Sequence, residues 1–195
     1  MRDARTQEMQ APTIIECPDE LRSLLASLQI SPDTIAARSL VLHPEATTLV
    51  IAETDEQGTE HFLAPLAANA WGAMKAAAAT DGVAIRIASA FRTIDPQAEI
   101  VRAKLLHGLP LESILCVSAP PGYSEHHSGC AVDVTTDGAP ALEQEFELTA
   151  AFTWLSRNAT RFGYFLSFPA NNRFGYAYEP WHWCFKQTEE SCGVA

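Results

Sequence analysis

The sequence predicts an α+β protein made of a single domain, in which helices flank a small, mostly antiparallel sheet. A chain of 195 residues with 47% hydrophobic residues can bury one substantial core, and this length is typical of one domain. Helical and strand-like segments are interspersed without a regular βαβ repeat, which favours an antiparallel sheet. We expect an N-terminal tail and helix over residues 1–38, followed by the main domain over residues 39–195.

The first half of the chain is predicted to contain two helices and an early group of strands. Residues 1–12 show no periodic pattern and are expected to form a tail, whereas leucines at helical spacing predict an amphipathic helix within residues 18–30. Residues 39–53 are rich in β-branched residues and leucine, and with the run that resumes at His61 they predict two or three strands around a turn. The alanine-rich segment 64–82 predicts a helix that stops at Asp81-Gly82.

Strands and helices alternate again in the second half. Apolar, strand-like runs occupy residues 83–90, 129–136, 164–168 and 181–185. Helical patterns run from Pro96 to His107, closed by residues 108–110, and over residues 149–161, ended by Gly163.

Composition limits the partners of this chain. The formal net charge of -11 opposes binding to polyphosphate, so nucleic acid is not expected as a partner. No run approaches the roughly 18 apolar residues that cross a membrane, and the polar start predicts a cytoplasmic location, or a periplasmic or cell-envelope one if a leader has been removed. The 5 cysteines include no C-x-x-C pair, which indicates reduced thiols. The oligomeric state is left open.

Three polar clusters interrupt otherwise apolar, strand-like sequence, where an unpaired buried charge would cost several kcal/mol. Each cluster therefore needs something that compensates its charge. The clusters are SEHHSGCAVDV (residues 124–134, with His126 and Asp133), YEPWHWCF (residues 178–185, with Glu179 and His182) and SAFRTIDPQ (residues 89–97, with Arg92 and Gln97).

Two of these clusters together contain the residue types that hold an open catalytic zinc site. Two imidazoles and one carboxylate leave the fourth position of a tetrahedral zinc ion for water, and His126, Asp133 and His182 are such a set. A nearby carboxylate that is not a ligand can take the proton from water, a role that suits Glu179. Because alternate residues of a regular strand face opposite sides, Pro180 predicts a bend that lets Glu179 and His182 converge.

Each motif by itself has a simpler interpretation. A His-His pair beside a glycine is more often a surface turn, and Glu-Pro-Trp-His more often a loop edge with a packed tryptophan. Arg92 alone would be half of a salt bridge. The conjunction of the three clusters favours a metal site.

The same motifs resemble those of a known enzyme group. SEHHSGCAVD matches S-x-H-x-x-G-x-A-x-D, and EPWH matches the E-x-x-H element, of the LAS zinc peptidases, named for lysostaphin, D-alanyl-D-alanine carboxypeptidases and sonic hedgehog. The blocks DGVAIRIASAFRTIDPQ, APPGYSEHHSGCAVDV, RFGYFLSFP and YEPWHWCF look like the D-alanyl-D-alanine carboxypeptidase branch. This branch includes vancomycin-resistance D,D-carboxypeptidases and peptidoglycan L,D-carboxypeptidases, and the resemblance covers roughly residues 65 to 186.

The resemblance implies a role for each matching residue. It implies one zinc ion per chain, held by His126, Asp133 and His182, with Glu179 as general base and later acid. Arg92 would face the substrate carbonyl or terminal carboxylate. The remaining implied substrate contacts are hydrogen bonds from Gln97 and Ser124 and a pocket wall formed by Trp181. His127 matches no ligand position and is expected to be structural.

The chain departs from the family pattern at two positions. Ser167 stands where relatives often carry arginine, and Cys184 stands where relatives often carry a basic residue. We expect both departures to affect substrate contacts and not the metal.

The resemblance implies a catalytic domain over residues 39–195 that removes a C-terminal D-alanine from peptidoglycan stem peptides or muropeptides. D,D- and L,D-specificity remain open. The alternatives are an endopeptidase or a D-Ala-D-Ala dipeptidase on the same scaffold, and a zinc-binding module without activity. The presence of both Glu179 and Arg92 favours an enzyme over a binding module.

Overall fold

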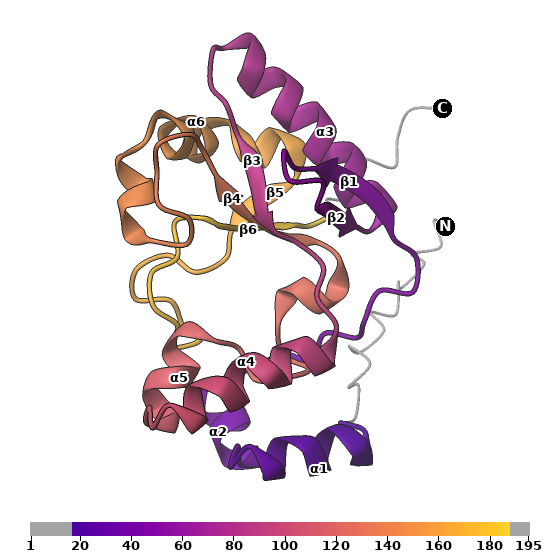
Figure 1. Cartoon of the computed structure of the whole chain (residues 1–195), viewed down its shortest axis with the longest axis vertical. Helices are drawn as coiled ribbons and strands as arrows, with labels where there is room; N and C mark the ends of the chain where they lie inside the picture. The colour runs from indigo at the N-terminus through magenta and orange to yellow at the C-terminus, as the bar shows by residue number, and fades with distance from the viewer. Residues whose placement is uncertain (1–16, 188–195) are drawn as a thin grey trace, which may run out of the picture.

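The central four-stranded sheet joins segments that are far apart in the sequence. In the computed structural model, which describes residues 17–187, its strands are β3 (Arg86–Ser89), β4 (Ala131–Thr135), β5 (Tyr164–Leu166) and β6 (His182–Phe185). They lie in the order β3-β4-β6-β5, and every neighbouring pair is antiparallel (Figure 1). The predicted α+β fold with a small antiparallel sheet is therefore confirmed.

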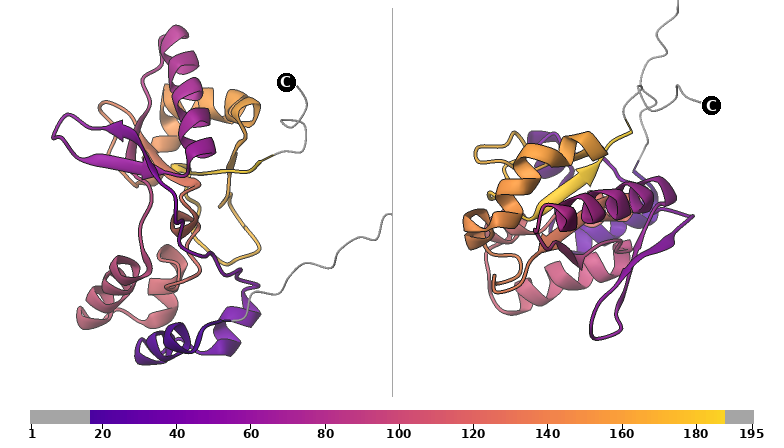
Figure 2. Two further views of the ribbon diagram at one scale, coloured as in Figure 1. Left: turned by 90° about the vertical axis from the view of Figure 1, so that its right-hand side faces the viewer. Right: turned by 90° about the horizontal axis from the view of Figure 1, so that it is seen from above.

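The larger hydrophobic core packs this sheet against helices α3 (Pro65–Thr80) and α6 (Ala150–Asn158) (Figure 2). Side chains of a strand alternate between its two faces. On β4, Val132 and Val134 belong to this core, and Asp133 lies between them in the sequence. Asp133 therefore points to the face opposite the core, although it is itself buried.

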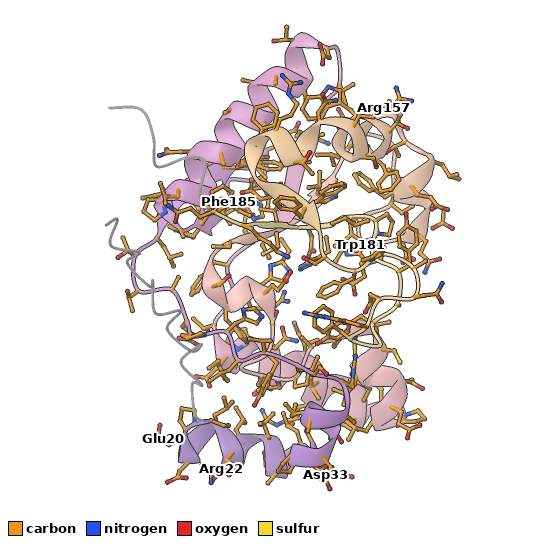
Figure 3. The ribbon with its side chains drawn as sticks, turned by 180° about the vertical axis from the view of Figure 1, so that it is seen from behind. Glu20, Arg22, Asp33, Arg157, Trp181 and Phe185 are labelled. Atoms are coloured by element: carbon orange, nitrogen blue, oxygen red, sulfur yellow. The ribbon has the colours of Figure 1, made fainter. Side chains whose placement is uncertain are left out.

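A second group of helices lies at the other end of the molecule (Figure 1). It consists of α1 (Asp19–Ser27), α2 (Pro32–Ala37), α4 (Ile94–Leu106) and α5 (Leu111–Val117). A separate hydrophobic cluster holds α1, α4 and α5 together, with Leu21 and Leu25 packing beside Val101 and Ile114. Charged residues on α1 and α2, among them Glu20, Arg22 and Asp33, project outward (Figure 3). The division of the chain at residue 38 stays a prediction.

Of the two or three strands predicted from residue 39 to the run that resumes at His61, two form, and neither lies within residues 39–49. A hairpin of β1 (Val50–Thr54) and β2 (Glu60–Leu63) forms as expected around the turn, but residues 39–49 are irregular. Their backbone bonds to a distant loop in place of a strand: the N–H of His43 donates to the carbonyl of Gly122, and the N–H of Ala46 to the carbonyl of His127, each at 2.8 Å. This segment thus braces the loop that carries the first metal-ligand candidate.

Two short helices were missed, and two predicted boundaries were displaced. The sequence carries a signal for the start of α2, because Ser31 is a favoured N-cap residue and a proline follows it. In the structure, the hydroxyl of Ser31 accepts a hydrogen bond from the N–H of Thr34. Helix α5 follows directly after Pro110. Helix α4 begins at Ile94 and not at Pro96, and α6 gives way to a short 3₁₀ turn, η3 (Ala159–Phe162).

Residues 1–12, predicted to be a tail, lie outside the described part of the chain. Within residues 17–187, no helix is both long enough and apolar enough to cross a membrane. The described cysteines, Cys17, Cys116, Cys130 and Cys184, are free thiols.

Candidate metal centre and active site

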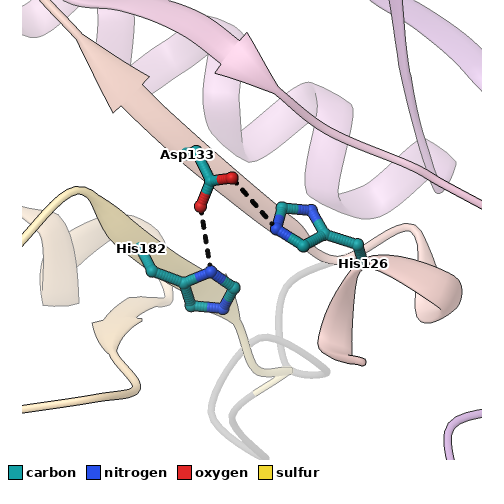
Figure 4. A group of neighbouring side chains, drawn as sticks. All are labelled: His126, Asp133 and His182. Carbon is teal, nitrogen blue, oxygen red and sulfur yellow. Dashed lines mark hydrogen bonds and ion pairs between the residues drawn. The ribbon is translucent and has the colours of Figure 1, made fainter. Parts of the chain in front are cut away.

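The three predicted metal ligands meet at one point of the structure (Figure 4). Asp133 on β4 and His182 on β6 are direct cross-strand neighbours, so the register of the sheet brings them together. His126 comes from the short 3₁₀ turn η1 (Glu125–Ser128) that precedes β4. All three side chains are buried, and one ligand atom from each lies within 4.8 Å of the others.

Gly129 turns the chain from η1 into β4. Its φ of 67° lies in the left-handed region, and its N–H donates to the carbonyl of His126 at 3.2 Å. A Cβ atom at this position would lie 3.0 Å from the backbone nitrogen of Ala64, so a larger residue would be strained in conformation and crowded against that backbone. Glycine therefore suits the turn between His126 and the strand that carries Asp133.

The geometry of these side chains fits a zinc ion. His126 Nε2 lies 3.2 Å from Asp133 Oδ2, and His182 Nδ1 lies 3.0 Å from Asp133 Oδ1. Ligands about 2.0 to 2.2 Å from a tetrahedral zinc ion are themselves about 3.4 Å apart. One ligand atom from each of the three residues lies within 4.8 Å of the others, so side-chain adjustments would bring them to these separations. Burial alone would raise the pKa of Asp133, but the two histidines hold that pKa well below its ordinary value. The site thus presents a carboxylate and two imidazoles, a donor set that zinc favours.

Glu179 stands beside this centre without being part of the ligand group. The N–H of His182 donates to the carbonyl of Glu179 at 3.1 Å, which confirms the bend predicted from Pro180. A carboxylate oxygen of Glu179 lies 4.0 Å from His182 Nδ1. Burial raises the pKa of Glu179 to about 7, against the opposing effect of His182. A carboxyl group with such a pKa can both accept and return a proton near neutral pH.

Every predicted site residue lines one pocket of about 630 Å³. Arg92 is half-buried there, and its Nε donates to Gln97 Oε1 at 2.8 Å. Ser124 is buried beside His126, and Trp181 lies half-buried between the pocket and the larger core (Figure 3). The structure therefore gathers the three sequence clusters around a single cavity.

Lys104 is a pocket residue that the sequence analysis missed. Gln97, Ile100 and Lys104 follow one another at helical spacing and line the pocket from one face of α4. The Nζ of Lys104 donates to Ser118 Oγ at 2.7 Å, and burial lowers the pKa of its ammonium group. In the sequence, the one feature that could have predicted Lys104 as a pocket residue was its helical spacing from Gln97 along a predicted helix.

Glu125 was also missed, although it stands in the first motif. Its Oε2 lies 3.0 Å from His182 Nε2 and accepts a hydrogen bond from Ser167 Oγ at 2.5 Å. Burial alone would raise the pKa of Glu125, but His182 and Ser167 outweigh it and lower the pKa to about 2. Ser167 therefore bonds to a carboxylate that contacts a metal-ligand candidate. The expectation that the departure at Ser167 affects substrate contacts and not the metal stays a prediction.

His182 consequently lies between two carboxylates. Burial alone would lower its pKa, but hydrogen bonds to Asp133 and Glu125 raise that pKa to about 10. His127, by contrast, faces the backbone: its Nδ1–H donates to the carbonyl of Arg92 at 2.6 Å, and its Nε2 accepts the N–H of Gly122 at 3.1 Å. These bonds are those of a structural histidine.

Comparison with known proteins places this site in a family. The model of the VanY D-alanyl-D-alanine carboxypeptidase family matches residues 60–188, which include all of the pocket residues named above. The chain belongs to the VanY family. A D-alanyl-D-alanine carboxypeptidase of Enterococcus faecalis is 34% identical over 129 residues, covering 60% of this chain and 46% of that protein. This VanY-family chain spans about half the length of the curated relatives that it matches.

Two solved structures of carboxypeptidases and peptidases share the fold. The LD-carboxypeptidase LdcB, described in connection with peptidoglycan recognition, matches with a TM-score of 0.64 and 30% identity over 72% of this chain and 69% of that one. A mutant of the vancomycin-resistance D,D-pentapeptidase VanY, solved with Zn(II), matches with a TM-score of 0.60 and 27% identity over 74% of this chain and 83% of that one. VanY from the VanB-type cassette has also been solved with D-alanine-D-alanine. The zinc in one of these structures agrees with the donor set found here.

Proposed function

We propose that this chain is a zinc-dependent carboxypeptidase that removes the C-terminal D-alanine from peptidoglycan stem peptides. The observation that carries the proposal is the meeting of His126, Asp133 and His182 in a pocket that also holds Glu179. Membership of the VanY family supports the same reaction. A zinc ion bound there would polarise the scissile carbonyl and lower the pKa of water to about 7.

The protein's own residues supply the proton transfer. Glu179 takes a proton from the attacking water and returns it to the leaving amine, and its raised pKa suits both steps. Arg92 is directed into the pocket by Gln97, where its guanidinium can stabilise negative charge that develops on the substrate carbonyl oxygen. Trp181 forms part of the pocket wall.

The assay that tests this function uses defined pentapeptide and tetrapeptide stem peptides. We expect loss of one D-alanine, abolished by a chelator and restored by zinc, with mass spectrometry to identify the products. Loss from the pentapeptide defines D,D-activity, and loss from the tetrapeptide defines L,D-activity. Internal cleavage would indicate an endopeptidase and dipeptide release a dipeptidase. If neither peptide lost a residue, the carboxypeptidase proposal would be rejected.

A carboxypeptidase must recognise a free C-terminal carboxylate, and this pocket holds two cations suited to that task. Among residues 17–187, neither Arg92 nor Lys104 forms an ion pair with an acidic side chain. Arg92 is engaged by Gln97 and Ser89, and Lys104 by Ser118, so both retain donors for a ligand. We propose that Lys104 binds the terminal carboxylate while Arg92 serves the scissile carbonyl.

Replacing Lys104 with methionine keeps most of the side-chain length and removes the charge. On a peptide with a free C-terminus, kcat/KM is expected to fall about 10- to 100-fold, the range for loss of a charge-assisted hydrogen bond. On the same peptide with a C-terminal amide, wild type and variant should differ little, because the carboxylate is already missing. Arg102→Met is the matched control, since Arg102 lies on the same helix and pairs with Glu99. Equal losses on both peptides, or none on the free acid, would contradict this role.

A further inference from the structure

The carboxylate of Glu125 makes a contact that the proposed reaction does not use. Its side chain is 15% exposed, and its Oε2 lies 3.0 Å from His182 Nε2. The other nitrogen of His182, Nδ1, lies 3.0 Å from Asp133 Oδ1. The imidazole of one metal-ligand candidate is therefore held by a carboxylate on each side.

Glu125 cannot serve as a further ligand to the same ion. Nδ1 and Nε2 point away from opposite sides of the imidazole ring, so a metal bound on the Asp133 side of His182 is out of reach of a carboxylate on the other side. The group of residues with converging ligand atoms accordingly contains His126, Asp133 and His182 but not Glu125. The contact of Glu125 with the centre passes through the ring of His182.

Such an arrangement has a known physical effect. A histidine that binds a metal through one nitrogen commonly donates the N–H of the other to a carboxylate, which fixes the tautomer and ring orientation and makes the ligand more basic. His126 lacks this support, because its Nδ1 is buried without a partner among the described residues. Of the two histidines proposed as metal ligands, only His182 therefore has, within the described part of the chain, a carboxylate that fixes its tautomer and ring orientation.

The surroundings of Glu125 direct its charge toward His182. The hydroxyl of Ser167 donates to the same carboxylate oxygen at 2.5 Å and orients it. Within residues 17–187, no lysine or arginine lies within ion-pair distance of Glu125, and the one ion-pairing partner it has is His182. A neutral hydroxyl orients the carboxylate without neutralising it.

We propose that Glu125, oriented by Ser167, is a positioning residue for the metal centre. It accepts the Nε2–H of His182, fixes Nδ1 as the metal-binding nitrogen and strengthens zinc binding. This inference rests on the proposed role of His182 as a zinc ligand. The Ser167–Glu125–His182 chain joins the residue that follows β5, the turn η1 and strand β6 through side chains to which the proposed reaction gives no role.

The experiment measures zinc affinity by competition with a chromophoric chelator. Glu125→Ala is expected to weaken zinc binding about 10- to 100-fold, the usual effect of losing such a partner. Glu125→Gln should weaken it less, because an amide can still accept the hydrogen bond but carries no charge. Ser167→Ala should produce a smaller loss in the same direction. In the cobalt-substituted protein, the visible absorption bands should shift in both Glu125 variants.

Matched measurements separate this role from a purely structural one. Glu143→Gln removes another carboxylate from the same pocket and should leave zinc affinity unchanged. Denaturant unfolding of each metal-free variant checks that the fold is retained. Wild-type zinc affinity and an unchanged cobalt spectrum in Glu125→Ala and Glu125→Gln would overturn the inference, whatever their stability. A wild-type protein that binds no zinc would instead overturn the proposed function itself.

Discussion

Replacing Glu179 with glutamine is expected to lower kcat on a stem peptide by about 100-fold or more while leaving zinc bound. The amide has nearly the shape of the carboxylate but cannot accept the proton from water, and general acid–base catalysis is typically worth about 10² to 10⁴ in rate. Glu179 lies 4.0 Å from His182 Nδ1 and outside the group of ligand atoms, so its loss should not release the metal. Steady-state kinetics and metal analysis of the same preparation provide both readouts.

Glu147→Gln is a suitable control for this variant. Glu147 is exposed in the 3₁₀ turn η2 (Gln144–Leu148) and does not line the pocket. Its replacement should leave kcat and zinc content at wild-type values. If Glu179→Gln retained wild-type kcat, another group would have to carry the proton. If it lost zinc, Glu179 would belong to the metal ligands and the division of roles within EPWH would be wrong.

Replacing His182 with alanine is expected to abolish zinc binding and, with it, peptide turnover. A catalytic zinc site has three protein ligands, so the variant would keep only His126 and Asp133. The loss of zinc affinity should exceed the roughly 10- to 100-fold that removal of a partner beyond the ligands costs. Chelator competition on wild type, His182→Ala and Glu125→Ala in parallel ranks the three proteins. Equal zinc affinity in wild type and His182→Ala would exclude this histidine as a ligand.

His107→Ala is the matched control for loss of an imidazole. His107 is exposed at the end of α4, where its Nδ1 contacts the carbonyl of Ala103 at 2.7 Å, and it does not line the pocket. The variant should bind zinc and turn over peptide as the wild type does. Loss of zinc in both histidine variants would point to a general effect on folding and not to a ligand role.

Local patterns in the sequence predicted most elements of the fold, because helix and strand periodicities are properties of short segments. The alanine-rich helix α3 and the strands around Asp133 and His182 were predictable in this way. The segment 39–49 was not, since its composition suits a strand while its backbone hydrogen bonds go to Gly122 and His127. Whether a polar backbone group finds its partner in a neighbouring strand or in a distant loop is decided by tertiary packing.

The candidate site likewise combines features that the sequence predicted with features that only the tertiary structure shows. The motifs S-x-H-x-x-G-x-A-x-D and E-x-x-H, read in the sequence by themselves, predicted the ligand types and the proton-transferring carboxylate and showed the family resemblance. Only the tertiary structure placed Lys104 in the pocket and set Glu125 against the far nitrogen of His182. The place of Lys104 depends on the position of α4, which lines the pocket. The contact of Ser167 with Glu125 depends on the pairing of β5 with β6, because Ser167 directly follows β5. The spacing of residues in the sequence does not predict such pairing. The free energy that fixes the pairing comes from burial and hydrogen bonds between segments that are far apart in the chain.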